Sequence, residues 1–131
     1  MMLAAPMSTP LATAIFRCSL CNETAGAVDL LPPGHPEGLS KGTSTIFLKD
    51  FIGTEQVVVS AAASPRVQAA LDKADAAALY EVEHLWAPFY CPTCARVYCR
   101  KHWVIVPEYD EGYFDCSHGT CPEGHRRLTE D

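Results

Sequence analysis

Residues 89–103 read Phe-Tyr-Cys-Pro-Thr-Cys-Ala-Arg-Val-Tyr-Cys-Arg-Lys-His-Trp and hold four candidate metal ligands within twelve positions. Cys91 and Cys94 form one pair with a two-residue gap, and Cys99 and His102 form a second pair with the same gap. Such a gap lets both side chains of a tight turn point at one tetrahedral ion, whereas disulfides have no need of it. This stretch therefore predicts zinc binding, and the zinc sites in turn decide the fold.

Further candidate ligands lie on both sides of this stretch. Cys18 and Cys21 form a third pair of the same spacing. A last cluster spans ten residues and consists of Cys116, His118, Cys121 and His125. Ten candidates fill two closed four-ligand sites and leave two over, so we expect two zinc ions. The residues alone do not decide whether the pairs join in sequential or crossed order.

The last cluster offers more ligands than one site needs. We favour Cys116 and Cys121 as the completing pair, because thiolate is the softer and stronger zinc ligand. His125 is the first substitute and His118 is the second.

Composition excludes several classes of protein. The chain has 131 residues, 48% hydrophobic and 20% charged, as expected for one globular domain rather than a disordered chain. Its net charge of −6 argues against a nucleic-acid-coating protein. No apolar run approaches the ~20 residues of a membrane helix. Seven cysteines at metal-ligand spacing indicate a reducing compartment, so we expect a cytoplasmic protein.

The amino terminus is expected to be a tail. Ala12-Thr13-Ala14 resembles a signal cleavage site, but a basic region is missing, and Pro6 and Pro10 interrupt the apolar stretch. We therefore expect residues 1–15 to be flexible and residues 16–131 to form a single zinc-binding domain. Residues 27–88 then form a hairpin-and-helix insertion between the zinc pairs.

The first part of that insertion has strand character. A short apolar strand is expected over residues 28–31, followed by a loop rich in proline and glycine over residues 32–44. Residues 46–52 and 56–60 are rich in β-branched and aromatic residues and predict a hairpin with its turn at 53–55.

The second part of the insertion is expected to be helical. Ser64 is expected to be the N-cap, with Pro65 at the first helical position. Apolar residues at three- and four-residue steps form one stripe: Val67, Leu71, Ala74, Ala78, Val82 and Leu85. Asp75 can cap a second short helix, so the segment is either one helix or two, ending at Pro88.

The carboxy-terminal third predicts two short strands and a helical turn. Residues 103–106 and 113–115 are expected to pair as a hairpin. Residues 120–123 have the spacing of a capping box. A helical turn there would place Cys121 and His125 on one face, four residues apart.

The run from Phe89 to Trp103 resembles the core of the stress-associated-protein zinc fingers and, more distantly, B-box and RING-like domains. These cross-brace families bind two zinc ions in crossed order, the first ligand pair with the third and the second with the fourth. Carried over to this chain, the resemblance implies one ion held by Cys18, Cys21, Cys99 and His102. It implies a second ion held by Cys91, Cys94 and two ligands of the last cluster. In this chain 69 residues separate Cys21 from Cys91, which is why residues 27–88 are interpreted as an insertion.

The expected fold is therefore α+β, a small two-zinc cross-brace or treble-clef-like core with the hairpin-and-helix insertion packed on it. The expected function is that of a non-enzymatic, zinc-stabilised protein-interaction module. A site closed by four protein ligands binds no substrate, whereas a catalytic zinc keeps one position open. The resemblance implies a RING-like or adaptor role in a ubiquitin-like conjugation pathway, with a protein partner.

Two other functions compete with this interpretation: a zinc enzyme with an open site, deaminase-like or hydrolytic, and a nucleic-acid-binding zinc ribbon. Zinc deaminases combine a His-x-Glu motif with Pro-Cys-x-x-Cys. The counterpart here is His35 with Glu37, but His35 lies in the expected loop and no proline directly precedes Cys91. A redox role of Cys91 and Cys94 lacks the usual strand–helix context. His84 has no second metal-binding partner nearby in the sequence and is interpreted as a surface histidine.

Exposed aromatic or basic side chains would mark a partner surface. Trp86 and Tyr109 are the aromatic candidates. The adjacent bases Arg100–Lys101 and Arg126–Arg127 are the candidates for an acidic partner, weighed against the simpler interpretation as solvated charges.

Overall fold

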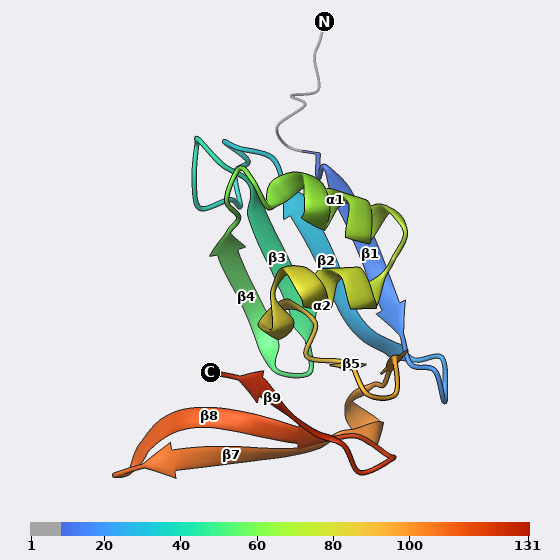
Figure 1. The fold of residues 1–131 in the computed structure, drawn as a ribbon. Helices are drawn as coiled ribbons and strands as arrows, with labels where there is room; N and C mark the ends of the chain where they lie inside the picture. Colours follow the sequence, from blue (N-terminus) through green and yellow to red (C-terminus); the bar gives the residue numbers. More distant parts are fainter. Residues whose placement is uncertain (1–8) are drawn as a thin grey trace, which may run out of the picture.

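A computed structural model describes residues 9–131, which form a four-stranded sheet, a two-stranded sheet and a three-stranded sheet with two α-helices (Figure 1). All strand pairs in this range are antiparallel. The α+β class is therefore confirmed as a small mixed domain. No helix of the described residues is long and apolar enough to cross a membrane.

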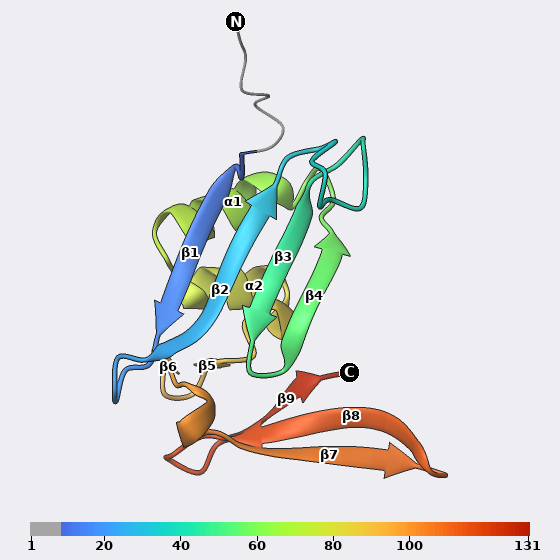
Figure 2. The same ribbon diagram turned by 180° about the vertical axis from the view of Figure 1, so that it is seen from behind.

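The four-stranded sheet is a meander of β1 (Ala12–Arg17), β2 (Thr24–Leu31), β3 (Thr45–Asp50) and β4 (Gly53–Val58). Along β1, buried and exposed residues alternate, so one face of the sheet is covered and the other is open. Figures 1 and 2 show both helices on the same face of this sheet.

Two predicted boundaries are wrong. β1 begins at Ala12, so residues 12–15 belong to the sheet and not to a tail, because their alternating small side chains pack under the helices. Residues 1–8 of the predicted tail lie outside the described residues. The predicted insertion boundary at residue 27 falls inside β2, which pairs with both β1 and β3.

The β3–β4 turn comes two residues earlier than predicted. Asp50 pairs with Gly53, which leaves Phe51 and Ile52 as the turn. The Asp50 carboxylate accepts hydrogen bonds from the amides of Ile52 (2.8 Å) and Gly53 (3.3 Å). Gly53 adopts a φ of 145°, which residues with a Cβ rarely adopt. These two local features outweigh the strand propensity of Phe51 and Ile52.

The helical segment forms two helices, α1 (Ser64–Asp72) and α2 (Ala76–Val82). Asp75 caps α2, as the two-helix alternative predicts, and accepts a hydrogen bond from the Ala78 amide at 3.1 Å. Ala74 breaks the helix with a φ of 49°. Ser64 is not the cap of α1: Ala63 is at that position, and the Ser64 hydroxyl hydrogen-bonds to the Ser44 hydroxyl at 2.9 Å.

The break also changes which side chains face the sheet. Val67 and Leu71 are buried, as the predicted stripe requires. Ala74 lies in the break and is exposed. The buried residues of α2 do not continue the spacing of those in α1. Leu79, which the predicted stripe omitted, is therefore fully buried.

The buried ring of Phe89 joins this core to the segments that follow. It stacks on Phe16 with the ring centroids 4.9 Å apart. It also covers Gly26, where an added Cβ would lie 2.5 Å from Phe89 Cε2. Gly26 therefore provides the space on β2 that lets this ring pack against the sheet.

Beyond the helices lie short elements and the three-stranded sheet: η2 (His84–Trp86), β5 (Tyr90–Cys91), β6 (Arg96–Val97), η3 (Arg100–His102), β7 (Val104–Asp110), β8 (Tyr113–Thr120) and β9 (Arg126–Glu130). Both views place the three-stranded sheet beyond the end of the four-stranded sheet where the β1–β2 turn lies (Figure 2).

This region differs from the sequence prediction in strand length and in the last turn. β7 and β8 extend well past the predicted residues 103–106 and 113–115. No helical turn forms at 120–123. The Cys121 amide instead donates to the His125 carbonyl at 2.9 Å, and the chain turns directly from β8 into β9. Gly124, with a φ of 90°, allows this tight turn.

Arg127 ties β9 to the preceding segment. Its guanidinium donates to the carbonyls of His84 (2.9 Å), Ala87 (2.7 Å) and Tyr90 (2.8 Å) and lies 5.1 Å from the centre of the Tyr80 ring. The interpretation of Arg126–Arg127 as a basic surface pair is therefore wrong for Arg127, whose donors are engaged inside the molecule.

Gly26→Ala is expected to lower the free energy of unfolding by about 1–3 kcal/mol, since the added methyl overpacks against the buried Phe89 ring. Gly42→Ala is the matched control. Its Cβ would meet only Ser40 Oγ, at 3.9 Å, and should change stability by less than ~0.5 kcal/mol. Denaturant unfolding of both variants measures this, and equal stability would contradict the packing argument.

Asp50→Asn is expected to stabilise the protein near neutral pH. Burial raises the pKa of Asp50 to about 6, with further increases from the charges of Glu55 and Glu130 and an opposing decrease from the amides of Ile52 and Gly53. The folded state therefore holds this proton more tightly than the unfolded state, and stability falls as pH rises from about 4 to about 6.

Asparagine keeps an acceptor for the turn amides and removes the buried charge. Above about pH 7 the variant should gain up to ~2 kcal/mol in unfolding free energy, and the gain should shrink as pH falls through 6. Unfolding of both proteins across this range measures the difference. A gain that does not vary with pH would rule out the charge as its cause.

Candidate metal centres

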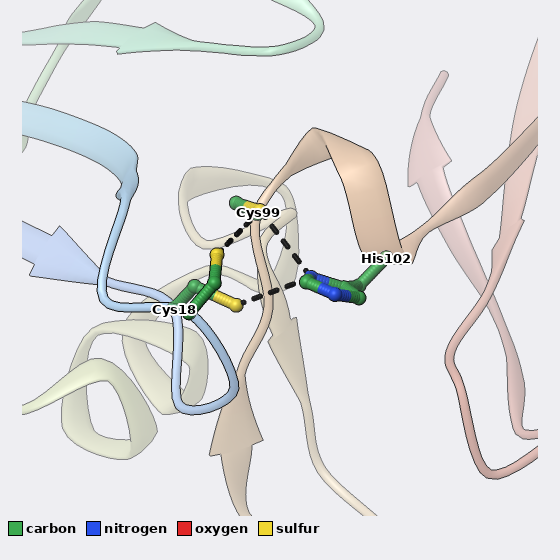
Figure 3. Close-up of side chains that lie close together, drawn as sticks. Cys18, Cys99 and His102 are labelled. Carbon is green, nitrogen blue, oxygen red and sulfur yellow. Dashed lines mark hydrogen bonds between the residues drawn. The ribbon is translucent and has the colours of Figure 1, made fainter.

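The first cluster combines two distant segments. Cys18 and Cys21 lie in the turn between β1 and β2, and Cys99 and His102 lie at the two ends of η3. Cys21 Sγ lies 3.6 Å from Cys99 Sγ, and the sulfurs of Cys18 and Cys99 each lie 3.4 Å from His102 Nδ1. Figure 3 shows the side chains of Cys18, Cys99 and His102 pointing toward one another.

Backbone geometry holds each half of this cluster in place. Asn22, with a φ of 64°, closes the β1–β2 turn by donating its amide to the Cys18 carbonyl at 2.9 Å. The Leu20 amide points at Cys18 Sγ, 3.4 Å away. On the other side, the His102 amide donates to the Cys99 carbonyl at 2.9 Å. Local backbone turns therefore fix the positions of both ligand pairs without a metal ion.

The second cluster joins two turns of the carboxy-terminal half. Cys91 and Cys94 lie at the β5–β6 turn, and Cys121 and His125 lie at the β8–β9 turn. Cys94 Sγ lies 3.7 Å from Cys121 Sγ, and the distances from His125 Nδ1 to the three sulfurs are 3.2–3.7 Å. The amides of Cys94 and His125 each point at a ligand sulfur at 3.4 Å.

The spacing of the donor atoms fits a tetrahedral zinc ion. Zinc–sulfur bonds of ~2.3 Å and zinc–nitrogen bonds of ~2.05 Å place neighbouring sulfurs about 3.8 Å apart and sulfur and nitrogen about 3.5 Å apart. The sulfur–sulfur distances of 3.6 and 3.7 Å in the two clusters are close to this and far longer than the ~2.05 Å of a disulfide. Each set of three cysteines and one histidine could therefore bind a metal ion such as zinc.

The thiols of each cluster differ in their tendency to ionise. Burial opposes ionisation of Cys18 and Cys121, but backbone amides that donate to the sulfurs lower their pKa values to about 6 and about 7. Burial, with the neighbouring thiols adding to it, raises the pKa of Cys99 and raises that of Cys91 to about 11. Without a cation, each cluster favours partial ionisation. A bound divalent ion would displace the remaining protons.

The candidate ligands group in crossed order, the first pair with the third and the second with the fourth. The structure brings together the four residues that the cross-brace resemblance implies for one ion: Cys18, Cys21, Cys99 and His102. Cys91 and Cys94 lie with Cys121 and with His125, the first substitute.

The preference for Cys116 in the second cluster does not agree with the geometry. Cys116 lies within β8, five residues before Cys121, and a strand advances ~3.3 Å per residue. The extended chain therefore carries its sulfur away from the β8–β9 turn. Cys116 lies instead with His118 and with Glu108, a carboxylate that the sequence analysis did not consider.

The other histidines of the sequence analysis lie elsewhere. His35 is buried in the β2–β3 loop and accepts a hydrogen bond from the Glu37 amide at 2.9 Å. Cys91 and Cys94 lie with other ligands, so the deaminase-like combination with His35 does not form. His84 stacks on Tyr80 with ring centroids 4.1 Å apart.

Arg127 is the structural residue that sequence reasoning missed. Its position beside Arg126 in the sequence suggests that its side chain is exposed to solvent. Only the β8–β9 register turns the side chain toward the Ala87 carbonyl inside the molecule. No local pattern in the sequence carries that information.

Similarity to known proteins is shown by a family model. No curated protein and no solved structure gives a significant match. A family model described as "Domain of unknown function (DUF8328)" matches residues 8–131. The chain therefore belongs to the DUF8328 family.

Proposed function

We propose that this protein is a zinc-stabilised protein-interaction module, in which two structural zinc ions hold the three-stranded sheet against the rest of the domain. The observation that carries the proposal is the pair of four-ligand clusters with tetrahedral spacing. Each cluster joins turns from separate elements, 78 residues apart for Cys21 and Cys99 and 27 residues apart for Cys94 and Cys121.

A structural role follows from the number of ligands. Four protein side chains fill a tetrahedral zinc ion and leave no position for water or substrate. Structural zinc sites contribute on the order of 10 kcal/mol to folding, comparable to the whole stability of a small domain. The two ions would therefore stabilise a three-stranded sheet in which β7 carries no buried residue.

The β7–β8 arm, residues 104–120, supports the interaction role. It carries five exposed large hydrophobic residues: Val104, Val106, Tyr109, Tyr113 and Phe114. Tyr109 and Tyr113 are 66% and 79% exposed, so neither side chain is packed into the core. Trp86, the other aromatic candidate, is partly buried against the core. Exposed aromatic residues on a hairpin are typical anchors of a protein interface.

A RING-like or adaptor role is a more specific second candidate, favoured by the crossed grouping of the ligands alone. A ubiquitin-conjugating enzyme titrated into isotope-labelled protein tests it. Saturable shifts confined to the residues around the two clusters would support this role, and no shifts at high enzyme concentration would remove it.

Removal of one ligand should remove one zinc ion. After dialysis against a weak chelator, native mass spectrometry should count two zinc ions in the wild type and one in Cys99→Ser. Cys116→Ser, outside both four-ligand clusters, is the control and should retain both ions. A strong chelator should lower the melting temperature by more than ten degrees, since zinc binding is coupled to folding. Fewer than two ions in the dialysed wild type would contradict the proposal.

Loss of the exposed rings should remove the partner while leaving the fold intact. The double variant Tyr109→Ser, Phe114→Ser is expected to lose at least tenfold in partner recovery during affinity capture from the source cells. Leu39→Ser, at a 54% exposed residue on the β2–β3 loop, is the control and should bind like the wild type. Equal recovery by all three proteins, each retaining two zinc ions, would exclude the β7–β8 arm as the interface.

A further inference from the structure

We propose a third metal site, formed by Glu108, Cys116 and His118 on the β7–β8 arm, that takes a divalent transition metal such as zinc through three protein ligands. The ligand atoms of these residues all lie within 4.8 Å of one another. This site is distinct from the two four-ligand clusters and shares no residue with them.

Strand geometry brings the three side chains to one face. Glu108 lies directly opposite Cys116 in the β7–β8 register, and His118 lies two residues further along β8. Side chains two residues apart in a strand project on the same side, and directly paired residues do as well. A bulge between Glu108 and Tyr109 sets this register, so a shift of one residue would separate the carboxylate from the thiol.

The donor atoms converge as a metal site requires. Cys116 Sγ lies 3.9 Å from Glu108 Oε2, and His118 Nδ1 contacts the same carboxylate oxygen. Thiolate, imidazole and carboxylate are the three side-chain groups that bind zinc in proteins. All three residues are partly buried, which limits competition from water.

An ion-pair network is the competing explanation, because Arg126 Nη2 lies 3.1 Å from Glu108 Oε2. A network of that kind accounts for Glu108, His118 and Arg126 but gives no role to the thiol. A carboxylate has two oxygens, so Glu108 can keep Arg126 as a hydrogen-bond donor and still offer an oxygen to a metal. Donors of this kind hold ligating carboxylates in place in known metal sites.

Three protein ligands leave one tetrahedral position for a group from outside the chain. In the two four-ligand clusters no such position remains. The proposed site lies on the same arm as the exposed rings of Tyr109, Tyr113 and Phe114. A partner that docks on the arm could therefore supply the fourth ligand, a sulfur, nitrogen or oxygen donor.

Cobalt is the probe, because Co²⁺ adopts zinc geometries and absorbs light. We expect protein that retains two zinc ions after dialysis to bind one further equivalent of Co²⁺ at micromolar free metal. It should give the near-ultraviolet band of a cobalt–thiolate bond. Cys116→Ser should abolish that band, and Glu108→Gln and His118→Ala should each weaken binding at least tenfold.

Asp115→Asn is the matched control. The Asp115 carboxylate also lies 3.9 Å from Cys116 Sγ, but it is outside the converging set, so its loss should change the affinity less than about threefold. No cobalt uptake by the wild type would overturn the proposal, as would uptake without a thiolate band or uptake that Cys116→Ser does not change. The count of two retained zinc ions is read separately. Failure of the four-ligand clusters therefore cannot be mistaken for failure of this site.

Discussion

The crossed grouping of the two four-ligand clusters is the constraint on which the rest of the structure depends. The first cluster attaches the end of β1 to η3, and the second attaches the β5–β6 turn to the β8–β9 turn. The segment from Cys91 to His102 contributes to both, so metal ions bound as proposed would hold its short strands from two sides. Other contacts also cross this junction, among them the stacking of Phe89 on Phe16, the hydrogen bond of the Ser19 amide to the Val97 carbonyl at 2.8 Å and the bonds of the Arg127 guanidinium.

The sequence predicts most of the local features and few of the long-range ones. The three two-residue gaps are local signals, and the structure places each pair in a tight turn. The α2 cap at Asp75 and the loop over residues 32–44 are equally local, and both are present. The choice between Cys116 and His125 is not local. It depends on how far β8 extends, and Gly119 in that strand gives no strand signal. A Cβ at Gly119 would approach Ile105 and Thr129 to 2.9 Å, a packing reason visible only in three dimensions.

The same limit explains why the third ligand group escaped the sequence analysis. The sequence prediction assigns Cys116 to the second zinc site, leaves His118 as a substitute and considers only cysteine and histidine as ligands. Glu108 joins them only through the antiparallel register, ten residues from His118 in the sequence. The two kinds of cluster also differ in how they are built. The four-ligand clusters are made of turns, whose amides point at the sulfurs, whereas the group on the β7–β8 arm is made of strand side chains.

The crossed order has a consequence for how the chain is made. Synthesis runs from the amino terminus, and segments that are complete begin to fold before the rest has emerged. The β1–β4 sheet and both helices are finished by residue 82, yet Cys18 and Cys21 have no partners until His102 leaves the ribosome. By then Cys91 and Cys94 have also emerged, and their cluster is complete only when His125 has emerged. Before His102 emerges, five cluster thiols of the nascent chain are therefore open to oxidation or to the wrong metal: Cys18, Cys21, Cys91, Cys94 and Cys99. If the clusters bind zinc as proposed, rapid capture of the ion is therefore a kinetic requirement of this topology.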